Sequence, residues 1–181
     1  MLIGISGSAG AGKDTLAEYL WRTHTFTRIA FADPMKRATQ AIFGLSDEQT
    51  WSRDLKEISI PYWGLSPRRM FQMVGTDAMQ GTFGRDVWLK RWKLSYEMVK
   101  DSENVVVPDV RFPQEAELIR ELGGYIIQLN RKCENGLDAE AKAHVSEAGI
   151  SVKYLDFVLH NDSSIDDMCL QMADFIKEKV S

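Results

Sequence analysis

Short apolar runs alternate with amphipathic segments along most of the chain. Residues 2–6 form an apolar run, and Leu16, Tyr19 and Leu20 follow it at helical spacing. A run of this length suits a buried strand, so the pattern predicts a strand, a loop and a helix in succession. Because the alternation recurs along the chain, we expect an α/β protein whose parallel sheet carries helices on both faces.

The same periodicity and the capping residues predict the remaining elements. The sequence near residues 44–64 is polar and poorly periodic, which predicts an irregular excursion over the surface. Residues 131–147 hold little apolar content and suit a mobile flap. The expected strands cover residues 28–31, 105–107, 125–129 and 156–160, and the expected helices begin at Asp33, Ser66, Trp88, Pro113 and Ser164.

Composition and charge narrow the class of protein. The 181 residues suit one domain, and 44% hydrophobic with 27% charged residues is typical of a globular chain. A net charge of −4 argues against binding along a nucleic-acid backbone. We expect a cytoplasmic protein without a membrane contact, because no apolar run approaches the roughly 18 residues of a membrane helix. The two cysteines and three histidines show no metal-ligand spacing.

The segment GSAGAGKDT, residues 7–15, carries the clearest chemistry. It matches the phosphate-binding pattern of Gly, four residues, Gly and Lys, but Asp14 stands where a hydroxyl is expected and Thr15 follows. Backbone N–H groups at a helix N-terminus suit a polyphosphate, and Lys13 can reach its β and γ groups. The candidate nucleotide-binding residues here are Ala9, Gly10, Ala11, Gly12, Lys13, Asp14 and Thr15.

A second candidate site follows the apolar strand at residues 105–107. Asp109 has the position of an acidic residue that helps to hold magnesium, although it could equally cap a turn or helix. Arg111 lies two residues further and would meet a second phosphate in the same cleft. Further cations stand near expected ligand-facing ends, where they would offset the repulsion between two phosphorylated substrates: Lys36, Arg37, Arg68, Arg69, Arg85 and Arg131.

An ordered set of motifs resembles the bacteriophage deoxynucleoside monophosphate kinases nearly from end to end. These motifs are GSAGAGKDTLA, ADPMKRA, WGLSPRRMFQMVGTDAMQ, FGRDVWLKRW, VVVPDVRFPQEAELIRELGG and HNDSSIDDM. The resemblance implies a single P-loop kinase domain over residues 1–181, with a helical substrate-binding region at about 33–100 and a lid at about 131–147. It also implies transfer of the ATP γ-phosphoryl group to a deoxynucleoside monophosphate. Because Mg²⁺ keeps much of its water shell, we expect the nucleotide and water to hold most of it.

The resemblance also assigns roles to individual residues. Lys13, Arg68, Asp109 and Arg111 would be catalytic, with Asp109 acting on the magnesium or on Arg111. From their residue types and positions, Asp14, Thr15 and Asp109 are the candidate protein donors near the magnesium. Arg131 and Lys132 would belong to the lid, and Asn161 would approach the adenine. The substrate-binding residues would be Lys36, Arg68, Gly75, Thr76, Trp88, Asp109, Arg111 and Glu115, with Trp88 either stacking on the base or belonging to the core.

Several alternatives stay open at the level of sequence. The same residues could phosphorylate another small phosphorylated acceptor, or the chain could be a nucleotide-gated binding module, a switch protein or a DNA-stimulated ATPase. Residues 160–163 lack the Asn-Lys-x-Asp pattern by which switch proteins recognise guanine. Which bases are accepted is undetermined, as is the formation of a homodimer.

Overall fold

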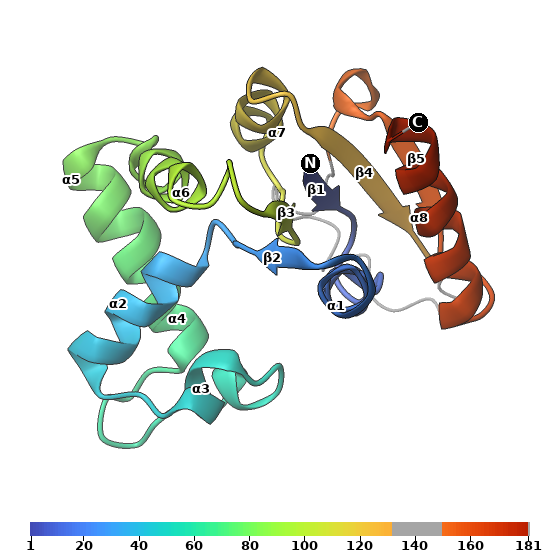
Figure 1. Cartoon of the computed structure of the whole chain (residues 1–181). Helices are drawn as coiled ribbons and strands as arrows, with labels where there is room; N and C mark the ends of the chain where they lie inside the picture. Colours follow the sequence, from blue (N-terminus) through green and yellow to red (C-terminus); the bar gives the residue numbers. More distant parts are fainter. Residues whose placement is uncertain (132–149, 181) are drawn as a thin grey trace. The chain divides into compact units, whose positions relative to one another are not determined.

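The computed structural model describes residues 1–131 and 150–180, and the chain forms two compact units (Figure 1). The first unit combines Met1–Ala30 with Tyr96–Ser181, and the second is Phe31–Ser95. Apart from Arg131, the expected lid at 131–147 lies outside the described residues. Among the described residues, no helix has both the length and the apolar character that crossing a membrane requires.

A parallel sheet forms the centre of the first unit. Its strands in the described part of the chain follow the order β2-β3-β1-β4-β5, with every neighbouring pair parallel. This arrangement confirms the predicted α/β fold class. Because the carboxyl ends of parallel strands share one edge, the segments after β3, β1, β4 and β5 leave the sheet along that edge. The strands are β1 (Leu2–Ser6), β2 (Phe26–Arg28), β3 (Asn104–Val107), β4 (Tyr125–Asn130) and β5 (Phe157–His160).

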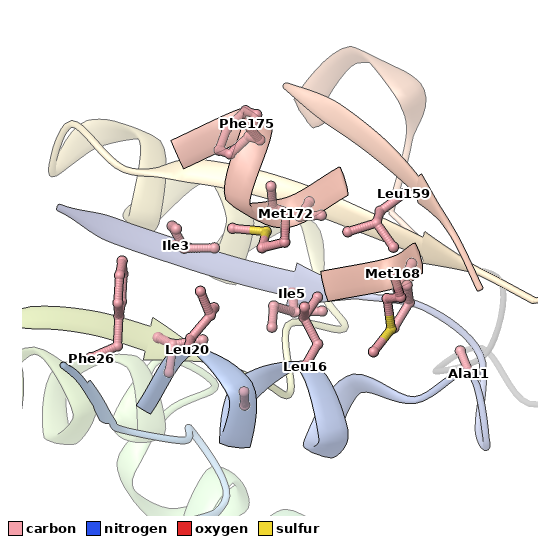
Figure 2. Packing of buried hydrophobic residues seen from close by; sticks show 14 residues of the cluster. Ile3, Ile5, Ala11, Leu16, Leu20, Phe26, Leu159, Met168, Met172 and Phe175 are labelled. Carbon is pink, nitrogen blue, oxygen red and sulfur yellow. The ribbon is translucent and has the colours of Figure 1, made fainter. Parts of the chain in front are cut away.

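Two helices, α1 (Lys13–His24) and α8 (Ile165–Val180), cover one face of this sheet (Figure 2). Ile3 and Ile5 of β1 point into this layer and are fully buried, as are Leu16 of α1 and Met172 of α8. Each such side chain stabilises the fold by about 1.5–3 kcal/mol on burial. The predicted capping box begins α8, because the Ser164 hydroxyl accepts a hydrogen bond from the backbone N–H of Asp167 at 3.1 Å.

The opposite face of the sheet carries α7 (Pro113–Glu121). Gly4 of β1 faces this helix, and a Cβ added to it would lie only 2.7 Å from Ile119 Cδ1. A helix that approaches a strand so closely leaves no room for a side chain. The period of two along β1 therefore places Ile3 and Ile5 against one helical layer and Gly4 against the other. A short 3₁₀ turn, η4 (Val152–Tyr154), precedes β5.

The second strand differs from its predicted position. The sequence predicts it at residues 28–31, whereas β2 covers Phe26–Arg28, with one further bond from the Ile29 N–H to the Val106 carbonyl. Buried Phe26 anchors the strand in the core of the first unit. Phe31, which extends the apolar run in the sequence, instead packs on Trp92 in the second unit with ring centroids 4.9 Å apart.

The second unit is built from helices around buried Leu45, Met70 and Phe71. Residues 44–64, for which the sequence predicts an irregular excursion, contain a helix that begins with a capping box between Ser46 and Gln49. The helical elements are α2 (Asp33–Phe43), α3 (Asp47–Trp51), η1 (Leu55–Glu57), α4 (Pro67–Gln72), the π-helical η2 (Met73–Gln80), α5 (Gly81–Phe83) and α6 (Val87–Glu97), the last of which ends in the first unit.

Candidate active site

The phosphate loop joins the end of β1 to the first residue of α1. Gly7 and Gly12 adopt φ values of 149° and 103°, which side chains rarely tolerate. A Cβ on Gly7 would clash with the Leu129 carbonyl oxygen, so the loop also passes too close to β4 for a side chain. The loop therefore presents its backbone at the N-terminus of α1, where the helix dipole favours an anion.

The side chain of Lys13 bonds back to the start of the same loop. Its Nζ donates hydrogen bonds to the carbonyl oxygens of Gly7 and Ser8, both at 2.7 Å. These bonds keep the ammonium group beside the backbone that would surround a phosphate. A bound polyphosphate would compete with the two carbonyls for the same ammonium, so Lys13 is placed to exchange partners when a nucleotide arrives.

Two side chains from the ends of other strands also reach the loop. Asn161, which follows β5, donates from Nδ2 to the Ala11 carbonyl at 2.9 Å. Arg131, which follows β4, donates from Nη1 to the Gly10 carbonyl at 3.3 Å. Both residues were expected to contact the nucleotide on the strength of the resemblance, and the structure places both beside the phosphate loop.

Asp14 and Thr15 lie in the first turn of α1, and both are exposed. An acidic side chain in this turn is favoured by the helix dipole. The Asp14 carboxylate and the Thr15 hydroxyl are therefore accessible to solvent and to ions at the N-terminus of α1, directly after the phosphate loop.

The segment after β3 lies next to the end of β1. Asp109 follows Val107 and Pro108, and the adjacent Val110 N–H donates to the Ile5 carbonyl at 3.2 Å. We call the residues between β3 and α7 the Asp109 segment. Since β1 and β3 are neighbours in the sheet, the phosphate loop and the Asp109 segment leave the sheet side by side. Asp109 is half-buried, whereas Arg111 is exposed.

Glu115 holds the backbone of this segment. It lies at position N3 of α7, where its Oε2 accepts hydrogen bonds from the Arg111 N–H at 2.6 Å and the Phe112 N–H at 3.0 Å. The side chain is only 8% exposed. Burial raises the pKa of the Glu115 carboxyl to about 7, which the two N–H groups and the Arg111 charge oppose and the Asp109 charge reinforces.

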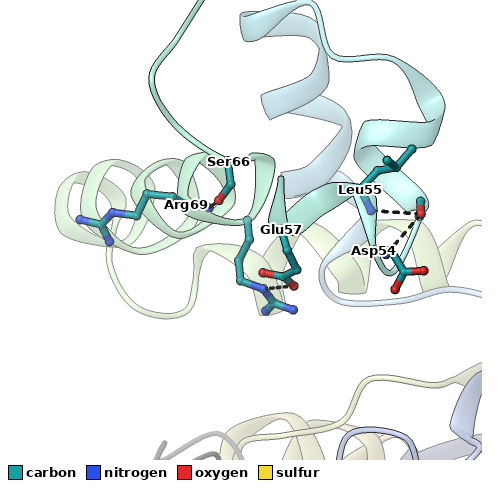
Figure 3. Close-up of polar contacts among 7 residues, drawn as sticks. Asp54, Leu55, Glu57, Ser66 and Arg69 are labelled. Carbon is teal, nitrogen blue, oxygen red and sulfur yellow. Dashed lines mark hydrogen bonds and ion pairs between the residues drawn. The ribbon is translucent and has the colours of Figure 1, made fainter. Parts of the chain in front are cut away.

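The second unit holds the predicted cations Arg68 and Lys36. Arg68, in the first turn of α4, donates from Nε to Glu57 Oε1 at 2.6 Å, and both side chains are 49% exposed (Figure 3). Ser66 caps the same helix, as the sequence predicts. The ammonium of Lys36 lies 5.0 Å from the ring centroid of Trp51. Sequence reasoning missed both partners, since nothing local links Glu57 or Trp51 to a cation.

The predicted substrate-pocket residues Gly75 and Thr76 lie in the π-helical segment η2. The indole N–H of Trp88 donates to the Gly75 carbonyl at 3.0 Å, and a Cβ on Gly75 would lie 3.1 Å from Met35 Cγ. Trp88 is half-buried, and Trp92 in the same helix is fully buried. π-helical turns are rare, and those that occur are often found at functional sites. No sequence pattern predicted this one.

Comparison with known proteins identifies the family. Residues 55–172 match the family model of deoxynucleotide monophosphate kinase. A proposed deoxynucleotide monophosphate kinase of Acanthamoeba polyphaga mimivirus is 37% identical to this chain over an alignment of 185 positions. The alignment covers 95% of this chain and 94% of that protein. The chain belongs to the deoxynucleotide monophosphate kinase family. As a kinase of this family, it is a phosphotransferase that acts on small nucleotide substrates, as the sequence predicts.

Further relatives agree with this assignment. The deoxynucleoside-5'-monophosphate kinase of Escherichia phage T5 is 27% identical over 242 residues, covering 97% of this chain and 95% of that protein. Dephospho-CoA kinase from Campylobacter jejuni has a similar fold, with a TM-score of 0.56 at 17% identity and coverage of 99% of this chain and 98% of that chain. At that identity the likeness supports the kinase fold alone. The predicted phosphate-loop kinase architecture is confirmed.

Proposed function

We propose that this kinase transfers the γ-phosphoryl group of ATP to the phosphate of a deoxynucleoside monophosphate, which yields the diphosphate and ADP. The observation that carries the proposal is the phosphate loop at the end of β1, next to the Asp109 segment at the end of β3. Ligands of open parallel sheets bind at this edge. Two anions that react there need cations, and Lys13 and Arg111 are the nearest candidates on these segments.

The nucleotide would bind through the backbone of the phosphate loop. Lys13 would leave the Gly7 and Ser8 carbonyls for the β and γ phosphates, since a phosphate is a stronger acceptor than a neutral carbonyl. The residues proposed to bind ATP, by direct contact or by holding the phosphate loop, are Ala9, Gly10, Ala11, Gly12, Lys13, Asp14, Thr15, Arg131 and Asn161.

The acceptor would bind through cations and through the predicted pocket residues. For Arg68, support comes from its half-exposed guanidinium, which Glu57 contacts through Nε. For Glu115, support comes from the loop that it orders, because that loop carries Arg111. The residues proposed to bind the deoxynucleotide are Lys36, Arg68, Gly75, Thr76, Trp88, Asp109, Arg111 and Glu115.

Magnesium fits the oxygen donors around the phosphate loop. The described residues contain no group of three or more His, Cys, Asp and Glu side chains able to hold a metal ion by themselves. Mg²⁺ keeps several waters and accepts one or two carboxylates beside substrate phosphates. Asp14, Thr15 and Asp109 offer such donors, so the ion would be held mainly by the nucleotide and water. When bound, it would neutralise charge on the β and γ phosphates.

Catalysis then requires positioning and charge rather than a general base. The second pKa of a phosphate monoester is about 6, so the attacking oxygen is ionised near neutral pH. This oxygen forms a bond to the γ phosphorus while the bond from that phosphorus to the β-γ bridging oxygen breaks, and ADP carries away the electron pair. Lys13 and Arg111 would stabilise the charge on the transferred group.

The proposal is tested by product analysis with ATP, Mg²⁺ and each common deoxynucleoside and ribonucleoside monophosphate. We expect equal amounts of ADP and deoxynucleoside diphosphate, with Lys13→Ala as the inactive control. Separate reactions contain DNA without an acceptor. Hydrolysis of ATP that depends on DNA and produces no diphosphate from an acceptor would overturn the proposal and favour a DNA-stimulated ATPase.

A further inference from the structure

Asn161 makes a contact that its expected role does not explain. Its side-chain Nδ2 donates to the Ala11 carbonyl at 2.9 Å, across 150 positions of sequence. The resemblance leads us to expect this residue beside the adenine. The structure instead places its amide on the backbone of the phosphate loop, so its influence on nucleotide binding would run through that loop.

The backbone of Asn161 is itself fixed. Its N–H donates to the Asn130 carbonyl at 2.8 Å, which extends the pairing of β5 with β4 by one residue. The preceding residue, His160, is held on both sides by Gln171, which accepts from its N–H at 3.2 Å and donates to its carbonyl at 3.0 Å. Because the donor stands on a fixed strand end, the contact can set the position of the loop.

The contact is also close enough to require a glycine. A Cβ added to Gly12 would lie 2.7 Å from Asn161 Nδ2, and Gly12 has a φ of 103°. The amide of Asn161 therefore packs directly over the residue that precedes Lys13. Gly12 is the N-cap of α1 and, as a glycine, has no side chain with which to cap the helix.

The geometry of one peptide group links this contact to the phosphate. The Ala11 C=O and the Gly12 N–H belong to the same trans peptide plane, in which they point in opposite directions. A carbonyl held by Asn161 therefore fixes the direction of the Gly12 N–H on the other side. A rotated peptide would present the carbonyl oxygen where an anion needs a donor.

We propose that Asn161 is a positioning residue of the phosphate loop, which orients the Gly12 N–H toward the nucleotide's polyphosphate and acts independently of the base. The inference rests on the proposed use of ATP at this loop, and it replaces the expected contact with adenine. It implies that Asn161 contributes equally to the binding of any nucleoside triphosphate and of inorganic tripolyphosphate, which has no base.

The test compares the dissociation constants of ATP, GTP and tripolyphosphate, each with Mg²⁺, by titration calorimetry. Asn161→Leu keeps the branched shape of the side chain but cannot donate, and His160→Ala serves as the control at an exposed neighbouring position. Losing one hydrogen bond and leaving the Ala11 carbonyl unpaired should weaken binding of all three ligands about tenfold. Thermal unfolding is measured for each variant, and Asn161→Ser replaces the leucine variant if that protein is not folded.

The outcomes separate the two roles of Asn161. Weaker binding of ATP with unchanged binding of tripolyphosphate would overturn the inference and restore a contact with the base. Equal affinities of the variant and the wild type for all three ligands would overturn it as well. A wild-type protein that binds neither ATP nor tripolyphosphate would contradict the proposed function itself, so the two failures are distinguishable.

Discussion

The two units hold their candidate ligand-binding groups in different ways. In the first unit, the phosphate loop and the Asp109 segment are fixed by bonds to backbone atoms, from Asn161 at the strand end and from buried Glu115. In the second unit, Arg68 is held by Glu57, and both side chains are half exposed. Removing the hydrogen-bond partner of a buried polar group costs about 1–3 kcal/mol of stability. An exposed ion pair contributes only about 0–1 kcal/mol.

This difference implies that the phosphate loop and the Asp109 segment are ordered before binding, whereas Arg68 of the second unit can change partners at little cost. Substitutions in the first unit should therefore have large effects that depend on local geometry. Substitutions at the exposed contacts of the second unit should have small effects that depend on charge and salt.

Removing the lysine of the phosphate loop should have the largest effect. Lys13→Ala deletes the cation that would stabilise the transferred phosphoryl group, so kcat should fall roughly 10²- to 10³-fold. Steady-state kinetics with ATP and a deoxynucleoside monophosphate measure this change. Lys93→Ala, at an exposed lysine of α6, is the control for loss of a positive charge. Near-native turnover of Lys13→Ala would refute the role of the loop.

Replacing the buried carboxylate should change how stability depends on pH. The folded-state pKa of Glu115 is about 7, above its ordinary value of 4.5, so its contribution to stability is fully present below about pH 4.5 and is lost as the pH rises through 7. Gln can fill the same position of a capping box but does not titrate. The unfolding free energy of the wild type relative to Glu115→Gln should fall by about 2.5 kcal/mol between pH 5 and pH 8.

Urea unfolding at the two pH values measures this difference. Glu121→Gln, in the same helix at an exposed position, corrects for the general loss of a negative charge. A stability difference between wild type and Glu115→Gln that stays constant with pH would show that burial does not raise the pKa of this carboxyl.

Crowding the phosphate loop should have an intermediate effect. Gly12→Ala places a Cβ 2.7 Å from Asn161 Nδ2 on a backbone with a φ of 103°, a conformation that costs about 1–3 kcal/mol for other residues. The affinity for ATP, measured by calorimetry, should fall about tenfold. Gly44→Ala is a matched control, since Gly44 has a φ of 63° and nothing within 4 Å of an added Cβ. Unchanged affinity in Gly12→Ala would mean that the loop tolerates displacement of Asn161.

Local sequence patterns predicted the parts of the first unit that are formed by consecutive residues. An apolar run, a glycine-rich loop and a helical stripe gave β1, the phosphate loop and α1, and the capping signals of α7 and α8 were equally local. The predicted position of β2 was wrong because Phe31 does not belong to the strand. Its apolar ring packs on Trp92 instead.

The contacts that hold the site could not be predicted in the same way. Asn161 reaches Ala11 across the sheet, and Glu57 reaches Arg68 only because η1 and α4 pack together. Neither pair has a sequence spacing that indicates contact. The resemblance indicated that residues such as Asn161 and Glu115 belong to the site. Their hydrogen-bond partners are known only from the folded structure.

The smallest effect is expected at the exposed contact of the second unit. Glu57→Gln keeps an oxygen that can accept from Arg68 Nε but removes a negative charge that would repel the acceptor phosphate. Because exposed charges interact weakly, the KM for the deoxynucleoside monophosphate should fall only about twofold, with kcat unchanged and the difference reduced at high salt. Kinetics at low and high ionic strength measure this. If the KM instead rose tenfold or more, Glu57 would be fixing Arg68 as firmly as Asn161 fixes the phosphate loop, and the contrast between the ordered segments of the first unit and the adaptable contact of the second unit would fail.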